Sequence, residues 1–291
     1  MNEIHRMAIN AVKNVDTFTL RRIGAAYIFK EKLLVDFTDM KGCTQLMYAA
    51  MEQKLYSVSE LLKRGADIDA KDYAGFTALM HVVKRGDSAT ATYLIDRKAD
   101  VEAQDNGGMT PLMIAASEFY DTRMVNVLLN RGADHSKTDS NGATALIHAS
   151  KALRLGNIGA LLDHGADINA ICGRGNSALS WAVKKNSVQA VELLLKRHAK
   201  VDLQHENGYT ALMFAVAGGN LKIVKLLVEN GADLMLRNSA SMTAYDIAKV
   251  QHYAAAESFL AKCMIYDPLE RGSLALARLK RSAPGPKYRI K

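Results

Sequence analysis

The segment from Thr77 to Gly108, TALMHVVKRGDSATATYLIDRKADVEAQDNGG, is followed from Thr110 by a segment of nearly the same pattern, TPLMIAASEFYDTRMVNVLLNRGADHSKTDSNG. Both segments open with a threonine and a short run of apolar and small residues. Both carry a second apolar run about twenty residues later. A repeat at this spacing indicates an array of similar supersecondary units rather than a fold with one central core.

The pattern recurs seven times along the chain. A motif such as GFTALMHVV at Gly75 or GYTALMFAV at Gly208 opens each unit, and a motif such as LLKRGAD at Leu61 follows it. The spacing is 33 residues with one step of 34. The threonine or serine that marks each unit is Thr44, Thr77, Thr110, Thr144, Ser177, Thr210 and Thr243.

Each unit has the residues expected of two short helices. The threonine is placed to cap the first helix, because its hydroxyl can accept a hydrogen bond from an unpaired backbone N–H. A second helix such as NLKIVKLLVEN, from Asn220, carries Ile223, Val224 and Leu227 on one face and stops at Gly231. One such unit cannot bury its own apolar face, so the units must stack.

The motif G-x-T-[AP]-L, an alanine pair and LL-x-x-GAD, repeated in register over residues 39–264, resembles the ankyrin repeat family. The resemblance implies an all-α solenoid of helix-turn-helix units with hairpin fingers. We expect seven repeats in 39–264, the last being a C-terminal cap. Residues 1–38 are predicted to form a degenerate N-terminal capping repeat, and 265–291 a basic, disordered tail.

Three departures from the family pattern have structural consequences. The histidine that usually follows the conserved leucine is replaced, for example by Met80, which predicts more reliance on apolar packing. Repeat three has an extra residue in SEFYDTRM, which predicts a longer turn between its helices. Repeat five has His198, Ala199 and Lys200 in place of GAD, which predicts a local weakening or an adapted binding finger.

Charge is unevenly distributed over the 291 residues. The net charge is +8, yet residues 39–264 carry 25 Lys and Arg against 24 Asp and Glu, while 265–291 carry seven against two. No stretch approaches the roughly 20 apolar residues that span a membrane. Polar residues interrupt the N-terminus where a signal peptide would need an apolar core. We expect a cytoplasmic protein, with nuclear or host-cell delivery left open.

No common catalytic signature occurs in the chain: there is no Walker loop, nucleophile elbow or HExxH motif. Cys43, Cys172 and Cys263 lack metal-ligand spacing and are predicted to be free thiols. His81 and His148 belong to equivalent positions two repeats apart, too far apart to share one ion. The sequence therefore predicts a protein without enzymatic activity, cofactor or metal site.

In the ankyrin family, partners usually contact the finger tips and the exposed side of each first helix, which line a concave groove. Carried onto this chain, the resemblance implies a surface with apolar anchors and an excess of cations. We expect a monomer that binds a protein, and an acidic segment with an apolar anchor fits best. The candidate contact residues are Tyr73, Phe76, Lys84, Arg85, Met109, Lys151, Arg174, Trp181, Lys184, Lys185 and Tyr209.

Alternative interpretations stay open at this stage. Exposed aromatic residues are common without a binding role, and Trp181 stands at a position usually packed between neighbouring helices. The basic tail could instead tether the protein to nucleic acid or an anionic surface through Arg278, Lys280, Arg281, Lys287 and Arg289. A lone ankyrin array with such a tail also fits a secreted effector of an intracellular microbe. Asn169 resembles the asparagine that is hydroxylated in some ankyrin repeats.

Overall fold

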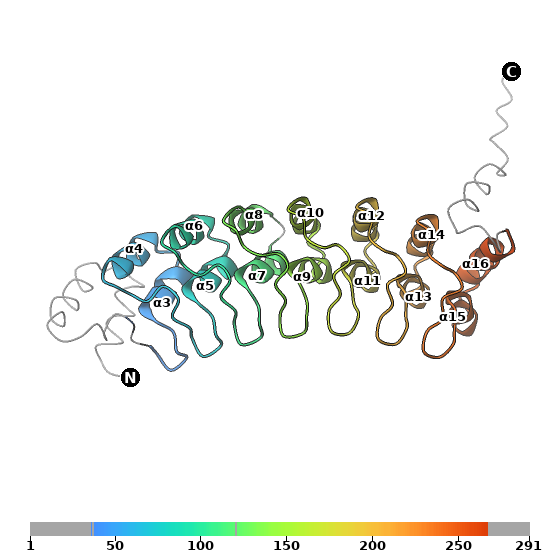
Figure 1. Ribbon diagram of the computed structural model, residues 1–291, viewed down its shortest axis with the longest axis horizontal. Coiled ribbons are helices and arrows are strands. Elements are labelled where there is room, and N and C mark those ends of the chain that lie inside the picture. The colour runs from blue at the N-terminus through green and yellow to red at the C-terminus, as the bar shows by residue number, and fades with distance from the viewer. Residues whose placement is uncertain (1–35, 37, 120, 267–291) are drawn as a thin grey trace, which may run out of the picture. The chain divides into compact units, whose positions relative to one another are not determined.

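A computed structural model describes residue 36 and residues 38–119 and 121–266 (Figure 1). Within these residues the chain forms fourteen helices, α3 to α16, and no strand. Ile171 and Ser177 form an isolated antiparallel bridge. The predicted all-α repeat solenoid is confirmed. Almost all of the predicted N-terminal cap and of the predicted tail lies outside the described residues, so both stay predictions.

The described helices fall into two compact units, which divide between Ala166 and Asp167. In each unit the helices alternate between a first and a second helix of a repeat (Figure 1). The first unit contains α3 (Gln45–Met51), α4 (Leu55–Lys63), α5 (Ala78–Arg85), α6 (Ser88–Asp96), α7 (Pro111–Glu118), α8 (Arg123–Asn130), α9 (Ala145–Lys151) and α10 (Leu155–Asp163). The second contains α11 (Ala178–Lys184), α12 (Val188–Lys196), α13 (Ala211–Ala217), α14 (Leu221–Glu229), α15 (Ala244–Val250) and α16 (Ala254–Tyr266).

The repeated threonine or serine caps every first helix, as the sequence predicts. Thr77 has an extended backbone, and its Oγ1 accepts the N–H of Met80, three residues into the helix, at 3.3 Å. The same bond forms at Thr44, Thr110, Thr144, Ser177, Thr210 and Thr243. Each cap satisfies a backbone donor that a short helix would otherwise leave unpaired.

Small and medium apolar residues form the contacts between repeats. Ala49, Ala50, Val82 and Val83 are fully buried, and α3 packs against α5, α5 against α7 and α7 against α9. In the second unit α11 packs against α13 and α13 against α15. Because the facing residues are small, the first helices approach closely, and each repeat covers the apolar face of its neighbour.

The fingers that connect the repeats pair with one another through their backbones. In the first unit Tyr73 N–H donates to Lys41 O at 3.0 Å, and Asn106 N–H donates to Ala74 O at 3.0 Å. Gly75 has a φ of 84°. A Cβ at this position would lie 2.7 Å from the Asn106 nitrogen, so a side chain would push the neighbouring finger away.

The extra residue of repeat three lies in a longer turn after α7, as predicted. Phe119 ends the helix in an extended conformation, so the last carbonyls of α7 need other partners. The buried Asn157 of α10 in the next repeat donates to the carbonyls of Ala115 at 3.3 Å, Ala116 at 3.1 Å and Phe119 at 2.8 Å. Arg154 Nε donates to Ser117 O at 2.9 Å.

We expect N157A to lower the free energy of unfolding by about 2 kcal/mol, because two buried carbonyls and one part-buried carbonyl lose their donor. Urea unfolding monitored by circular dichroism measures this loss. N126A is the control, since Asn126 on α8 is half-buried and, among the described residues, its side chain donates to the Thr122 hydroxyl and not to a carbonyl of α7. Equal effects of the two substitutions would contradict the assigned role of Asn157.

A residue with positive φ follows each of several second helices. Gly65, Gly132 and Gly231 take φ values of 86°, 89° and 86°, whereas His198 takes 63° at the equivalent position. The backbone bond is kept there, since His198 N–H donates to Leu195 O at 3.0 Å. A side chain in this conformation is strained, and Lys98 in repeat two shares it with a φ of 73°, so the weakening of repeat five stays a prediction.

H198G is expected to stabilise the protein by about 0.5–1 kcal/mol, because relief of the left-handed strain exceeds the added entropy of the unfolded chain. K98G is a matched test in the other unit, since Lys98 has a φ of 73°. Urea midpoints at constant slope measure both. A glycine that left either midpoint unchanged or lowered it would refute this account.

None of the described helices is long and apolar enough to cross a membrane. The three cysteines are free thiols, with Cys43 and Cys263 buried and Cys172 half-buried.

Candidate protein-binding surface

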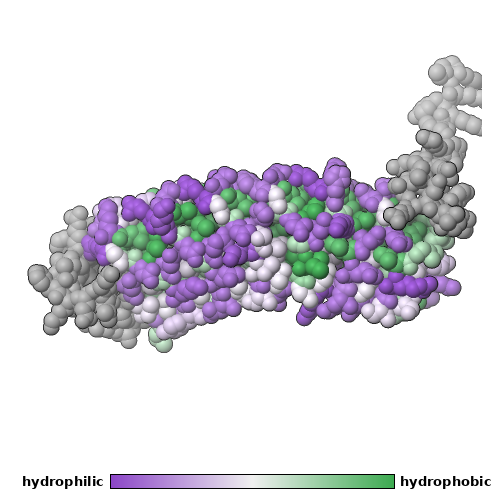
Figure 2. Space-filling model, in the orientation of Figure 1, coloured by the Kyte–Doolittle hydropathy of each residue, from purple (hydrophilic) through white to green (hydrophobic). Residues whose placement is uncertain are grey.

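Tyr73 is the most exposed aromatic side chain among the predicted contact residues. It is 72% exposed at the tip of a finger in the first unit. Its ring lies against Gly42 of the preceding finger, where a Cβ would be 2.7 Å from Tyr73 Cδ1. Figure 2 shows the described part of the first unit with mostly hydrophilic residues over the finger loops. The Tyr73 ring is therefore accessible to solvent while its contact with Gly42 holds it in place.

Phe76, three residues along the same finger, is half-buried rather than exposed. Its ring is tilted against His81, with ring centroids 5.3 Å apart. Lys84 Nζ lies 5.4 Å from the centre of the Phe76 ring. Lys84 and Arg85 form the exposed last turn of α5. The sequence expectation of a water-facing Phe76 is thus only partly correct, because the side chains of α5 cover it.

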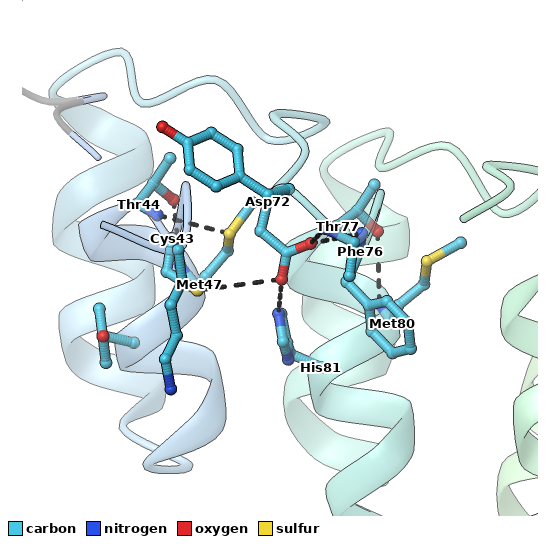
Figure 3. Close-up of polar contacts among 12 residues, drawn as sticks. Cys43, Thr44, Met47, Asp72, Phe76, Thr77, Met80 and His81 are labelled. Atoms are coloured by element: carbon cyan, nitrogen blue, oxygen red, sulfur yellow. Dashed lines mark hydrogen bonds and ion pairs between the residues drawn. The ribbon is translucent and has the colours of Figure 1, made fainter. Parts of the chain in front are cut away.

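A carboxylate in several fingers connects the finger to the following first helix. Asp72 Oδ1 accepts the N–H groups of Ala74 and Phe76, both at 2.9 Å, and Asp72 Oδ2 lies 3.0 Å from His81 Nε2. Figure 3 shows this arrangement between the finger and α5. Asp139 and His148 repeat it, with Oδ2 and Nε2 2.9 Å apart. One side chain therefore fixes both the loop and its angle to the helix.

Burial governs the protonation of these histidines. It lowers the pKa of His148 below the ordinary value, although the neighbouring Asp139 acts in the opposite direction. Burial also opposes ionisation of Asp139, but hydrogen bonds from Ala143, Asn141 and His148 outweigh it and lower the pKa of Asp139. The histidine is therefore held neutral beside an ionised carboxylate near neutral pH.

Lys184 is the centre of a cation–aromatic cluster in the second unit. Its Nζ lies 4.0 Å from the centre of the Phe214 ring and 5.6 Å from that of Trp181. The same ammonium donates to Asn176 Oδ1 at 2.5 Å. Burial lowers the pKa of Lys184. Lys184 is exposed, and its ammonium group is at the same time engaged with Asn176 and the two rings within the unit.

The remaining candidates of the second unit surround this cluster. Tyr209 is half-buried and packs on Phe214 with ring centroids 5.1 Å apart. His205 meets Phe214 edge to face at 5.8 Å. Arg174 at a finger tip and Lys185 at the end of α11 are exposed. This part of the chain therefore combines aromatic edges with exposed cations.

The remaining candidates belong to neither of these groups. In the first unit Met109 is half-buried in a finger, and Lys151 is exposed at the end of α9. The five candidate residues of the tail lie outside the described residues. Asn169 is half-buried, and its Oδ1 accepts the backbone N–H of Lys200 at 2.8 Å. The asparagine that resembles a hydroxylation site therefore serves as a link between repeats.

Sequence reasoning missed the role of the finger carboxylates and of Cys43. Cys43 Sγ lies 3.9 Å from Asp72 Oδ2, and these atoms and His81 Nε2 all lie within 4.8 Å of one another. His81 and His148 are too far apart to share an ion, and the cysteines and histidines have no regular metal-ligand spacing. The available signal was positional, since Asp72 and His81 stand five residues before and four after a capping threonine, and Cys43 one residue before the preceding cap.

The family model for ankyrin repeats in three copies matches five overlapping segments, which together cover residues 46–267. This chain is an ankyrin repeat protein. The match begins in α3 and ends one residue after α16, so it includes all the fingers between these helices. The seven helix pairs and their capping residues described above are the structure expected of such repeats.

Among solved structures, the chain is similar to the crystal structure of the ankyrin repeat domain of Bcl-3, described as a unique member of the IkappaB protein family. The two are 29% identical, with a TM-score of 0.69, and the similarity covers 76% of this chain and 99% of the Bcl-3 domain. No curated protein matches the sequence. Ankyrin repeats and this similarity indicate an interaction module that binds proteins.

The His148 environment predicts a stability that falls in mild acid. The unfolded chain takes up a proton near pH 6.5, whereas the folded protein resists protonation because the pKa of His148 is lowered. The free energy of unfolding is therefore expected to decrease as pH falls from 7.5 to 5.5. H148Q should show a smaller decrease than wild type in urea unfolding at the two pH values. H252N, at an exposed histidine, should keep the wild-type decrease, and an identical pH response of H148Q and wild type would refute the assignment.

Proposed function

We propose that this protein is a non-enzymatic adaptor or inhibitor that binds a protein partner through its finger tips and the exposed sides of its first helices. Membership of the ankyrin family and the similarity to the Bcl-3 domain support binding of a protein. Within each unit, caps and backbone bonds between fingers fix the loops and helices that carry the candidate residues. The residues that differ from repeat to repeat determine the partner.

The observation that carries this proposal is the group of aromatic and basic residues in the second unit. Arg174 and Lys185 are exposed, and Tyr209 and Trp181 are half-buried. Aromatic residues that keep part of their surface accessible can anchor an apolar side chain at low entropic cost. Exposed cations next to them attract an acidic segment and raise its association rate. An acidic partner segment with an apolar anchor fits this group.

The first unit offers a second contact of the same chemical type. Tyr73 is 72% exposed, and Lys84 and Arg85 stand exposed on α5 of the same repeat. Like the second unit, it presents an aromatic ring together with positive charge. We include both surfaces in the proposed function and assign the apolar anchor of the partner to the second unit.

The test starts from partners captured from the source cells, identified by mass spectrometry and then purified. R174E combined with K185E reverses two exposed charges and should lower the association rate about tenfold or more at low salt. Melting temperature should stay near that of wild type, because neither side chain is buried. Lys184 is left unchanged, since its contacts with Phe214 and Asn176 make it structural as well.

K196E combined with K200E is the matched control, because it reverses two exposed charges of the same unit at the end of α12 and beyond it. An equal loss of association rate in this control would exclude the assigned surface and indicate a general effect of net charge.

The alternative function, a tether to nucleic acid through the basic tail, is tested with a chain that ends at residue 266. Capture that disappears with this truncation or with nuclease would favour the tether.

A further inference from the structure

Three side chains of different metal-binding chemistry converge between the first two fingers of the first unit. Cys43 comes from one repeat, and Asp72 and His81 come from the next (Figure 3). Asp72 Oδ2 lies 3.0 Å from His81 Nε2 and 3.9 Å from Cys43 Sγ. All three potential ligand atoms lie within 4.8 Å of one another, the only such group of three among the described residues.

We propose that Cys43, Asp72 and His81 bind a divalent transition metal ion such as Zn²⁺. Thiolate, imidazole and carboxylate are the ligands that zinc prefers. At metal–ligand distances of about 2.0–2.3 Å, tetrahedral ligand atoms are roughly 3.3–3.7 Å apart. The three atoms therefore need to move by about 1 Å or less, and a fourth position is left for water or a group from a partner.

The surrounding bonds hold the ligands in this arrangement. Asp72 uses Oδ1 for its own finger, where it accepts from Ala74 and Phe76, and so directs Oδ2 towards His81 and Cys43. The Cys43 backbone is held by Asp39, because Cys43 N–H donates to Asp39 Oδ1 at 2.9 Å and Asp39 N–H donates to Cys43 O at 3.1 Å. Cys43 is only 6% exposed, which limits competition from solvent. Such supporting bonds are what a metal site needs beyond its ligands.

Another pair of neighbouring fingers in this chain has the same arrangement but lacks the cysteine. Asp139 and His148 form the same pair, and Met109 occupies the position of Cys43. Met109 N–H donates to Asp105 Oδ1 at 2.8 Å, and Asp105 N–H donates to Met109 O at 3.1 Å, as at Cys43. The thioether of Met109 carries no charge and is a weak acceptor. The thiol is thus the feature that distinguishes the proposed site from its structural equivalent.

Metal binding at this site would replace a proton on sulfur. Burial, followed by the charges of Asp39 and Asp72, raises the pKa of Cys43 to about 11, so the metal-free protein carries a thiol. The metal–sulfur bond forms as the S–H bond breaks, and the proton passes to solvent. The ion would then join the first two described repeats through side chains of both, in addition to the backbone hydrogen bond and the ring contact between their fingers.

The experiment uses the full chain, reduced with a phosphine and freed of metal with a chelator. Co²⁺ replaces Zn²⁺ as a spectroscopic probe, because a cobalt–thiolate bond gives a near-ultraviolet charge-transfer band. We expect one equivalent of Co²⁺ to produce this band and Zn²⁺ to displace it. C43A should abolish the band and weaken Zn²⁺ binding, measured against a chromophoric chelator, by at least about 100-fold. C172S, C263A and H148N should behave as wild type.

Absence of the band in wild type, or its persistence in C43A, would overturn the proposal. A measurement on wild type alone guards against misfolding of a variant: Zn²⁺ should slow the alkylation of Cys43, followed by mass spectrometry over hours, and not that of Cys172. Equal alkylation of Cys43 with and without Zn²⁺ would also overturn it. M109C places a thiol beside Asp139 and His148 and is expected to bind a second equivalent of Co²⁺, whereas a single equivalent would show that these three ligands do not suffice.

Discussion

A pair of short helices cannot bury its own apolar face, and the stacking of the repeats follows from that constraint. Helices of seven to nine residues, such as α3 and α14, are too short to be stable alone. Their stability comes from the fully buried contacts with neighbouring repeats. Stacking in turn determines which side chains pack between repeats and which remain exposed on the finger tips and first helices. The surface available for binding is therefore a by-product of how the repeats cover one another.

The contact between a finger and the following first helix takes two forms among the described residues. In the first unit, Asp72 and Asp139 connect finger to helix through a histidine. In the second unit, His205 stands at the carboxylate position and packs against Phe214, whose ring also holds Lys184. The same scaffold position thus carries a carboxylate–histidine hydrogen bond at Asp72 and Asp139 and an aromatic contact at His205.

Most of the fold could be predicted from the sequence, because the capping threonines, the glycines after the helices and the apolar stripes are local signals repeated at a fixed period. The longer turn of repeat three could be predicted from one extra residue. The Asn157 contacts to that turn could not, since they depend on how two repeats pack. For the candidate surface, the sequence predicted which positions belong to it but not the contacts that their side chains make. The engagement of Lys184 and the convergence of Cys43 with Asp72 and His81 arise from side chains that no periodic pattern relates.

The turn after α7 also limits how freely the repeats can be exchanged. An inserted residue has left carbonyls at the end of α7 whose donors come from Asn157 and Arg154 of the following repeat. Repeat three and repeat four therefore depend on each other, because the longer turn of repeat three needs the hydrogen-bond donors of repeat four. A recombination event, or a designer, that duplicated or deleted either repeat alone would separate the donors from the acceptors. At this point of the array, repeats three and four must therefore be duplicated or deleted together.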